Sequence, residues 1–432
     1  MQRTLLFVFA GFLVGCSPSA TEDKPAFYTG ARLITGDGSE PIENASFLVE
    51  HGEFTRVGPT GPFQAPAGAT IVDLKGKTVI PALVDAHAHL GWAVLQTGKI
   101  DTETYTKENL QDHLRRYAFY GIAAVQSMGI DKGEIAYEVR ASSGPDMALL
   151  HTAGRGIAMP NAGPGQAYWK PVAYAVSTDA EARKTVQELA AKKVDFVKIW
   201  VDDRAGTVQK LKPELYRAII DEAHKSGLRV VAHIFYLADA KDLLRAGIDG
   251  FAHGVRDIDI DDEFLTLIKA RPEVFVIPNL PDRGASASDW AFAGEALPAA
   301  RIQQMKDTAA KPNVELYNVQ ARNLMKLVNA GVRIGFGTDS GVAVGWTAHQ
   351  ELVDMVNAGM KASDVLVAAT RTAAGIMKLD KLGGIEMGKS ASFVVLDGNP
   401  LEDISNTRRI SRVYLNGRAV DREGLKKGFT TP

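Results

Sequence analysis

The residues best suited to chemistry form one short run, Val84-Asp85-Ala86-His87-Ala88-His89. This run continues an apolar stretch, and we expect it to lie on a β-strand. Residues two apart on a strand point to the same face, so His87 and His89 are expected to share one side. Two imidazole nitrogens on one side can bind a single metal ion. The run therefore indicates a metal site, although a His-x-His pair alone is a weak signal.

Four further polar residues fall near the carboxyl ends of other predicted strands, and these are Lys198, His233, His253 and Asp339. Taken singly, each has an ordinary structural explanation, because a lone polar residue in a strand is commonly a hydrogen-bonded core residue. Together with the histidine pair they make six polar groups at one rim. So many converging polar groups are hard to satisfy without a cation. The set favours a metal-dependent site.

Between about residue 79 and residue 380, short apolar runs alternate with amphipathic ones. The eight runs predicted as strands are residues 79–87, 121–128, 147–153, 195–201, 229–235, 247–253, 273–279 and 333–338. The predicted helices include residues 106–119, 178–192, 213–226 and 314–330. Eight alternations over about 300 residues favour a (β/α)8 TIM barrel over an open doubly wound sheet. Active sites of such barrels form at the carboxyl ends of the strands, where the six polar residues fall.

The two ends of the chain have a different texture, with short strands separated by turns that contain glycine and proline. We expect residues 27–80 and 381–425 to form one small β-sandwich domain beside a barrel domain of residues 81–380. The dipeptide Asn416-Gly417 is a strong hairpin signal within the second segment.

Residues 1–16 resemble a bacterial lipoprotein signal peptide. Arg3 supplies a positive charge, and residues 5–15 form an apolar stretch that is too short to span a membrane. The run Leu13-Val14-Gly15-Cys16 resembles a lipobox, and its cysteine, the only one in the chain, would carry the lipid. Residues 17–26 then form a polar linker. These features predict export and lipid anchoring to a bacterial membrane, with the outer membrane facing the periplasm favoured.

The composition is that of a globular protein. Of the 432 residues, 46% are hydrophobic and 23% are charged, which is sufficient for a large core. Lysine and arginine number 49 against 51 aspartate and glutamate, so no basic excess indicates a nucleic-acid partner. A single cysteine excludes an intramolecular disulfide and a cysteine-rich zinc module.

The polar set and its surroundings resemble the amidohydrolase superfamily, specifically its binuclear metal-dependent hydrolases of the prolidase-like and imidazolonepropionase-like subgroup. The likeness covers residues 27–425. It includes the runs Gly383-Gly384-Ile385-Glu386-Met387-Gly388-Lys389 and Val394-Val395-Leu396-Asp397-Gly398-Asn399-Pro400-Leu401. One departure is Ser390-Ala391-Ser392, where the family usually has an aspartate after the alanine. This departure falls in the expected β-domain, away from the predicted site.

The resemblance implies that two divalent ions are bound. His87, His89 and Asp339 would bind the more buried ion, and His233 and His253 would bind the more exposed one. Zinc is the expected metal, and manganese or cobalt would also be accommodated.

The resemblance also implies two chemical roles. Lys198 would react with carbon dioxide to form a carbamate whose two oxygens bridge the ions. Such a reaction needs an unprotonated amine, which burial beside cations favours. Asp339 would hold a bridging hydroxide, take its proton during attack and pass that proton to the leaving nitrogen.

These roles imply hydrolysis of a C–N amide bond in a small molecule, with a dipeptide or an N-acyl amino acid as the leading class. A mononuclear enzyme that opens a cyclic amide or deaminates a ring is an alternative, which Lys198 at the bridging position disfavours. A lactone or phosphotriester hydrolase on the same metal pair is left open. A non-catalytic scaffold is disfavoured because all six ligands are retained. A homo-oligomer is common in the resembled family.

Two residues near the predicted ligands are weaker candidates for substrate binding. Tyr236 follows His233 by three residues, and related dipeptide-cleaving enzymes place a tyrosine near this point with a different spacing. Arg256 could bind a substrate carboxylate, but it could equally pair with the acidic run from Asp257 to Glu263.

Other features concern the walls of the site. Tyr168, Trp169 and the segment 281–312 follow predicted barrel strands, and such loops commonly form lids or substrate walls. His113 and His224 are expected on helix surfaces.

Overall fold

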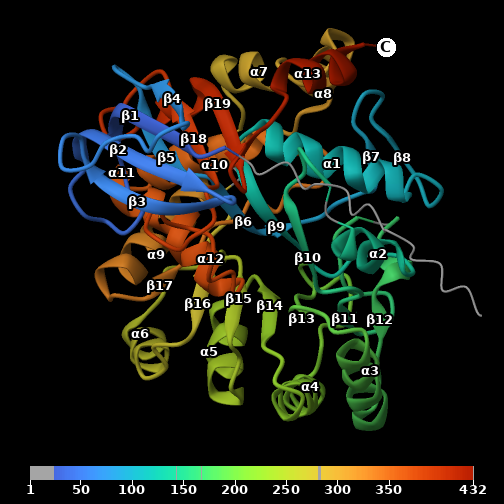
Figure 1. Cartoon of the computed structure of the whole chain (residues 1–432). Coiled ribbons are helices and arrows are strands. Elements are labelled where there is room, and N and C mark those ends of the chain that lie inside the picture. The colour runs from blue at the N-terminus through green and yellow to red at the C-terminus, as the bar shows by residue number, and fades with distance from the viewer. Residues whose placement is uncertain (1–23, 143, 167, 281–283, 432) are drawn as a thin grey trace, which may run out of the picture.

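The computed structural model describes residues 24–142, 144–166, 168–280 and 284–431. The predicted signal peptide and Cys16 lie outside these residues, so lipid anchoring stays a prediction. None of the described helices is both long and apolar enough to cross a membrane. The chain has a mixed α/β architecture, which confirms the predicted class (Figure 1).

One mixed sheet contains strands from both ends of the described chain (Figure 1). Its strands follow the order β20-β19-β18-β5-β1-β2-β3, with β4 paired to β1. Their bounds are β1 (Ala26–Leu33), β2 (Ile42–Glu50), β3 (Glu53–Pro59), β4 (Thr70–Asp73), β5 (Thr78–Pro81), β18 (Phe393–Leu396), β19 (Ile410–Leu415) and β20 (Arg418–Ala419). Strand β18 lies antiparallel to β5, with Phe393 opposite Pro81. The two chain ends therefore pair directly, while the predicted domain boundaries stay predictions.

An aromatic cluster fills the core of this sheet. The rings of Tyr28 and Phe47 stack at a centroid distance of 4.7 Å, and those of Phe393 and Tyr414 stack at 4.5 Å. Tyr28 also meets Phe393 edge to face at 5.2 Å. Such pairs each contribute about 0.5–1.5 kcal/mol beyond their buried area. The cluster therefore joins the N-terminal strands to the C-terminal ones by side-chain packing as well as by backbone pairing.

Local sequence signals set several element ends. The hairpin predicted at Asn416-Gly417 is confirmed, because β19 and β20 pair antiparallel and both turn residues have left-handed φ angles of 51° and 78°. Thr178 and Glu181 form a reciprocal capping box at the start of the helix that follows them.

The central part of the chain forms parallel strands that pair in chain order. Their bounds are β6 (Leu83–Ala88), β9 (Ile122–Ser127), β10 (Leu149–Thr152), β13 (Val197–Val201), β14 (Val230–Ile234), β15 (Gly250–Ala252), β16 (Phe275–Ile277) and β17 (Arg333–Ile334). Strands β6, β9 and β10 pair in one sheet, and β13 to β17 pair in another, which also holds β11 (Ile157–Ala158) and β12 (Tyr174–Ala175). Backbone hydrogen bonds connect the two sheets at both ends, from Ala86 to Phe336 and from Asp195 to Thr152, each 2.9 Å. The carboxyl ends of all these strands therefore face one rim.

Helices follow the parallel strands and cover their outer side, as α3 to α6 show in Figure 1. The helices that match predicted ones are α1 (Lys107–Phe119), α3 (Asp179–Ala191), α4 (Pro213–Lys225) and α9 (Val314–Asn329). The others are α2 (Ile135–Ala141), α5 (Leu237–Ala246), α6 (Asp262–Lys269), α7 (Ala287–Ala293), α8 (Ala299–Thr308), α10 (Trp346–Asn357), α11 (Ala362–Val367), α12 (Ala373–Ile376) and α13 (Arg422–Thr430). Helix α13 packs on α1 instead, where the rings of Phe429 and Phe119 meet edge to face.

His113 is not on a helix surface, so that prediction is wrong, whereas His224 is exposed as expected. The His113 ring is fully buried on the inner side of α1. Its Nδ1 accepts a hydrogen bond from the Gly91 backbone N–H at 3.1 Å, and its Nε2 lies 2.7 Å from the Ala93 carbonyl oxygen. A neutral ring protonated on Nε2 satisfies both contacts. His113 therefore fastens the loop after β6, which carries His89, to α1.

This geometry predicts that the protein loses stability in acid. Burial lowers the pKa of His113 from 6.5 to about 4, so the unfolded chain binds a proton there before the folded chain does. The free energy of unfolding should fall by about 3 kcal/mol from this residue as the pH drops from 6.5 to 4. Urea unfolding at pH 7 and pH 4 would measure the loss. His113→Gln should show a smaller loss than the natural protein, and an equal loss in both would contradict the assignment.

Candidate metal centre

The predicted histidine pair lies at the end of β6. His87 is fully buried and His89 is 7% exposed. Their ring centroids are 5.3 Å apart, which agrees with two side chains on one face of the strand. The Asp85 carboxylate fixes this strand end, because it accepts hydrogen bonds from the His87 N–H at 3.0 Å and the Thr338 hydroxyl at 2.7 Å. Asp85 thus ties β6 to the residue before Asp339.

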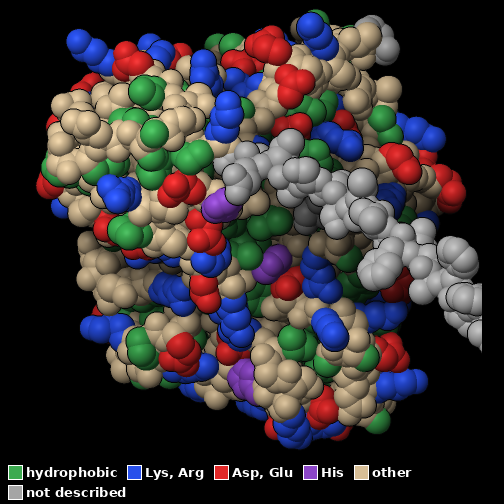
Figure 2. Space-filling model, viewed as in Figure 1, with side chains coloured by type: hydrophobic (Ala, Val, Ile, Leu, Met, Phe, Trp, Pro, Cys, Tyr) green, Lys and Arg blue, Asp and Glu red, His purple; other side chains and the backbone are tan. Residues whose placement is uncertain are grey.

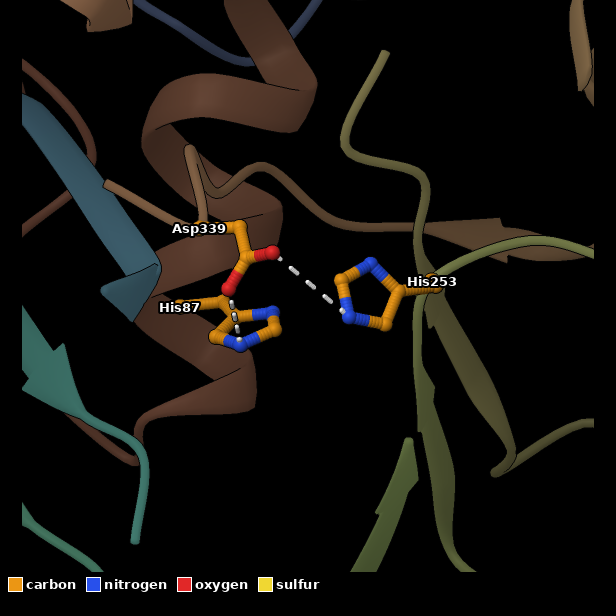
Figure 3. A group of neighbouring side chains, drawn as sticks. All are labelled: His87, His253 and Asp339. Atoms are coloured by element: carbon orange, nitrogen blue, oxygen red, sulfur yellow. Dashed lines mark ion pairs between the residues drawn. The ribbon is translucent and has the colours of Figure 1, made fainter. Parts of the chain in front are cut away.

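Asp339 lies in the loop after β17 with a left-handed φ of 54°. This unusual backbone angle turns its carboxylate toward the histidines. One carboxylate oxygen is 3.2 Å from His87 Nε2 and 3.0 Å from His89 Nε2. The other is 3.8 Å from His253 Nε2, and Figure 3 shows the carboxylate between the rings of His87 and His253. The structure therefore brings the carboxylate to the centre of the predicted set.

His253 and His233 complete the imidazole cluster. His253 follows β15 with a φ of 136°, and its ring centroid lies 5.0 Å from that of His87 and 4.6 Å from that of His233. His253 is 1% exposed and His233 is 6% exposed. Residues from β6, β14, β15 and the loop after β17 thus meet at one rim.

Lys198 lies on β13 and is fully buried. Its ammonium nitrogen has no hydrogen-bond partner among the described residues. Gly129 leaves space beside it, since a Cβ there would lie 2.9 Å from Lys198 Cγ. Burial lowers the pKa of Lys198 to about 7, although the nearby Asp339 carboxylate opposes the shift. A sizeable fraction of this amine is therefore neutral near neutral pH.

The donor atoms fit a divalent cation. One nitrogen each of His87 and His253 and one oxygen of Asp339 lie within 4.8 Å of one another. In the part of the chain that the structure describes, buried atoms without a hydrogen-bond partner include His87 Nε2, His89 Nδ1, His253 Nδ1 and Lys198 Nζ. Burying a polar atom without a partner costs free energy, and imidazole nitrogens and carboxylates are common ligands of zinc. The group of His87, His253 and Asp339 therefore fits a metal ion.

The protonation states also suit metal binding. Burial lowers the pKa of His87 and His253 well below 6.5 and that of His233 to about 3, so the rings are neutral at neutral pH. Desolvation raises the pKa of Asp339, but its interactions with His87 and His89 outweigh desolvation and hold that pKa well below its usual value. The site therefore presents lone pairs and one carboxylate rather than competing protons.

Two side chains that the sequence analysis missed orient the ligand rings. The Asn279 side-chain oxygen lies 3.1 Å from His87 Nδ1, and an Asp202 carboxylate oxygen lies 3.0 Å from His233 Nε2. A neutral ring that donates through one nitrogen presents the lone pair of the other, so each contact selects the tautomer available to a metal. Asp202 follows β13 by one residue, and that position was its only sequence signal.

Replacing Asp202 by asparagine should weaken metal binding without unfolding the protein. Burial raises the pKa of Asp202, but hydrogen bonds from His233 and Arg204 outweigh burial and lower that pKa to about 2, so the residue acts as a carboxylate. The neutral amide holds the imidazole less firmly, and the metal affinity should fall about 10–100-fold. Titration with a competing chelator would measure the change. Asp203→Asn, one residue on, should leave the affinity unchanged, and equal behaviour of the two variants would contradict the orienting role.

The two predicted substrate residues, Tyr236 and Arg256, differ in how they lie relative to the cluster. Tyr236 donates a hydrogen bond from its hydroxyl to Asp203 at 2.9 Å, beside Lys210. The backbone N–H of Arg256 donates to the Phe235 carbonyl at 2.9 Å, and the guanidinium lies close enough to lower the pKa values of His253 and Lys198. The structure therefore brings the charge of Arg256 to the centre and directs Tyr236 to Asp203.

Trp169, which was predicted to line the site, contacts a predicted metal ligand. The ring of Trp169 lies 5.2 Å from that of His89, and a Cβ at Gly341 would lie 2.9 Å from the same indole. The described part of segment 281–312 includes α7 and α8, which line a cavity of about 460 Å³ together with α10. Thr338, next to Asp339, also lines that cavity. In the space-filling view, a hollow at the centre holds hydrophobic and histidine side chains, with charged side chains around it (Figure 2).

Comparison with known sequences agrees with this geometry. A sequence profile of the Amidohydrolase family matches residues 78–420, which is well over half of the chain. The chain belongs to the amidohydrolase family. The match spans β5 to β20, so it includes every residue of the metal centre and the C-terminal part of the mixed sheet.

Several proteins resemble this amidohydrolase over most of their length. An uncharacterized protein of Mycobacterium tuberculosis is 28% identical over 311 residues, covering 70% of this chain and 75% of the relative. An imidazolonepropionase of Deinococcus radiodurans is 25% identical over 397 residues, covering 87% of this chain and 92% of the relative. The structure of a Xaa-Pro dipeptidase superimposes with a TM-score of 0.72 at 23% identity, covering 92% of this chain and 99% of that one. The last similarity shows a shared fold, and the family assignment makes this protein a hydrolase.

Proposed function

We propose that this amidohydrolase is a binuclear metal-dependent enzyme that cleaves a C–N amide bond in a small substrate, such as a dipeptide or an N-acyl amino acid. The observation that carries the proposal is the Asp339 carboxylate, which lies among buried neutral imidazoles at the rim where Lys198 is buried without a hydrogen-bond partner. The scaffold in this proposal is a (β/α)8 barrel with a β-sandwich domain built from both chain ends. The parallel pairing of β6 to β17 and the backbone hydrogen bonds between the two sheets support the barrel.

The ligand set divides into two groups in this proposal. His87, His89 and Asp339 would hold one ion, and His233 and His253 would hold the other. Zinc suits this mixture of nitrogen and oxygen donors, and manganese or cobalt would also be accepted. Asp339 lies closer to the first pair of rings than to His253, which supports its place in the first group.

Lys198 would join the two groups after reaction with carbon dioxide. The neutral amine attacks the carbon of CO2, a new N–C bond forms, and one proton leaves to solvent. The product is a carbamate with two oxygens on a side chain that ended in one nitrogen. The pKa of about 7 supports this step, because only the neutral amine has the lone pair that it needs.

Asp339 would move the proton during hydrolysis. Bound divalent ions would lower the pKa of a water molecule and polarise the scissile carbonyl. The Asp339 carboxylate accepts a proton from that water as its oxygen adds to the carbonyl carbon, and it then donates the proton to the nitrogen as the C–N bond breaks. An amide nitrogen leaves poorly as an anion, so the position of this carboxylate among the ligands decides whether the bond can break.

The similar proteins support hydrolysis of a C–N bond. Imidazolonepropionase and Xaa-Pro dipeptidase are both hydrolases of C–N bonds, and the two similar proteins with these names cover almost all of the described chain. The latter, by its name, acts on a dipeptide. The presence of Lys198 at the strand that would bridge two ions favours the binuclear, open-chain class over the mononuclear, cyclic one.

The test combines metal analysis with a substrate screen on the full chain purified in detergent with zinc supplied. About two ions per chain and hydrolysis of a dipeptide or N-acyl amino acid are expected. About one ion, with turnover of cyclic amides, would replace this proposal by the mononuclear one. A folded protein that binds no metal would overturn both.

We also propose that the protein is exported and anchored by a lipid on Cys16, facing the periplasm from the outer membrane. The support is the lipobox-like run before that cysteine and the polar linker after it. Fractionation of cells that produce the natural chain or Cys16→Ala would test the anchor. The natural chain should sediment with membranes, and the variant should not. A membrane-bound variant would contradict lipid anchoring.

A further inference from the structure

A second cavity, of about 310 Å³, lies beside the metal centre at the same rim. Its lining includes Trp92 from the loop after β6, Lys132 from the loop after β9, Arg155 from the loop after β10, and Tyr168. We call this cavity the Lys132–Arg155 pocket. Because its walls are loops that follow parallel strands, the pocket is built from the same end of the fold as the metal ligands.

The backbone brings the two cations of the pocket together. Ile130 and Arg155 form an antiparallel bridge, so the segments that carry Lys132 and Arg155 run side by side. The Lys132 ammonium donates a hydrogen bond to the Thr102 carbonyl at 2.8 Å. The Arg155 guanidinium donates to the Val172 carbonyl at 2.6 Å and lies over the ring of Tyr174 at 3.9 Å. Both side chains are held in place by contacts that leave their charges uncompensated.

Among the described residues, no carboxylate lies within 4.0 Å of either cation. Nearby acidic residues have other partners. Asp131, next to Lys132, accepts hydrogen bonds from the hydroxyls of Ser127 at 2.7 Å and Tyr105 at 2.9 Å. Asp101 pairs with Lys99 at 3.0 Å, and Glu134 pairs with Lys192 at 2.7 Å. Both cations line the same pocket, so an anion in the pocket would be attracted by both. The pocket is therefore electrostatically suited to a carboxylate.

The remaining wall is aromatic and rigid. Trp92 is 1% exposed, and its indole N–H donates to the Ile130 carbonyl at 2.9 Å, so the ring cannot turn away. Tyr168 meets Trp169 edge to face at 5.2 Å, and Trp169 in turn lies 5.2 Å from the ring of His89. Two ring contacts thus connect the pocket to a predicted metal ligand. An apolar segment of a ligand could follow these rings while its charged end lies in the pocket.

We propose that the Lys132–Arg155 pocket binds the terminal carboxylate of the substrate. This inference rests on the proposed hydrolysis at the metal centre. The rings of His89 and Tyr168 are joined through Trp169 by two ring-to-ring steps of 5.2 Å each, so a chain of at most about three extended residues connects them. The class is a short peptide or acyl chain with an apolar part and a free carboxyl end.

Binding of 4-phenylbutyrate to the zinc-loaded full chain tests the pocket without turnover. The acid should bind at least about tenfold more tightly than 4-phenylbutanamide, which has the same shape without the charge, because two cations face the carboxylate. Isothermal titration calorimetry would measure both affinities. Lys132→Gln should remove most of the preference, and Lys132→Gln with Arg155→Gln should remove all of it. Lys107→Gln, which removes an exposed charge at the start of α1, should keep it.

Three results would overturn the pocket. The acid and the amide could bind equally, or the preference could survive in Lys132→Gln. Thirdly, the preference for the acid over the amide could persist in the double variant and disappear when zinc is removed. That result would show that the carboxylate binds the metal. Arg155 also fastens a loop, so Lys132→Gln, whose side chain is exposed, keeps the test valid if the double variant unfolds.

Kinetics then connect the pocket to the substrate. In Lys132→Gln, KM for a hydrolysed peptide with a free carboxyl end should rise about tenfold, while kcat stays nearly unchanged. KM for the same peptide as its C-terminal amide should not change. If the protein hydrolysed no peptide but still preferred 4-phenylbutyrate to the amide, only the proposed function would be contradicted. If Lys132→Gln hydrolysed the peptide with an unchanged KM, only the role of the pocket would be contradicted.

Discussion

Replacing Asp339 by asparagine is expected to remove most turnover while most of the metal stays bound. The amide keeps one oxygen near His87 and His89, at the position where the carboxylate oxygen lies 3.2 Å and 3.0 Å from their Nε2 atoms. It cannot accept a proton from water or return one to the leaving nitrogen. Loss of proton transfer costs about 10²–10⁴-fold in kcat. Initial rates and metal content measured on the same preparation would give both numbers.

The control for this variant is Asp262→Asn, which removes an exposed carboxylate at the start of α6. It should retain full activity and full metal content. If Asp339→Asn kept activity within about tenfold of the natural protein, another group would have to move the proton. If it lost the metal as well, Asp339 would be needed for binding, and its catalytic role would require a separate test at saturating zinc.

The parts of this site that the sequence predicts depend on local patterns. His87 and His89 are two residues apart, and the two-residue period of a strand is enough to place them on one face. Helix periodicity is equally local, and the predicted helix 314–330 differs from α9 by a single residue at its end. The placement of the polar residues at one rim then follows from the alternation of strands and helices.

The residues that orient the ligands could not be found in this way. Asn279 is 192 positions from His87 in the sequence, and no periodicity relates the two. Asp202 lies 31 positions from His233, in a loop whose course depends on how β13 and β14 pair. Contacts of this kind are decided by the packing of whole elements, so they appear only once the three-dimensional structure is known.

His113 is a different case, because a signal was present. On α1, Leu110, Leu114 and Tyr117 are buried, and His113 lies at helical spacing from two of them on the same face. A polar residue at such a position indicates a buried group with fixed hydrogen-bond partners. His113 was predicted to be a surface residue because histidine is polar, although its position in the sequence lies on the buried face of the helix.

Replacing Lys198 by alanine is expected to abolish activity and metal binding together. The side chain is fully buried on β13, its nitrogen has no hydrogen-bond partner among the described residues, and its pKa is near 7. If its carbamate bridges the two ions, its removal takes one oxygen ligand from each. The metal content should fall from about two ions per chain to below one, and kcat/KM should fall by more than about 10³-fold. Elemental analysis and initial rates would measure both.

Rescue by small acids distinguishes a bridging carboxylate from a structural lysine. Alanine leaves a space where the side chain stood, and formate, acetate or propionate could place two oxygens there, so added acid should restore part of both metal content and turnover. Lys198→Met fills the space with an uncharged chain and should bind no more metal with acid than without. Lys184→Ala, at an exposed position on α3, should change neither quantity. Full metal content and turnover in Lys198→Ala without any acid would exclude the bridge. A folded variant that no acid restores would leave Lys198 as a structural residue and remove the carbamate from the mechanism.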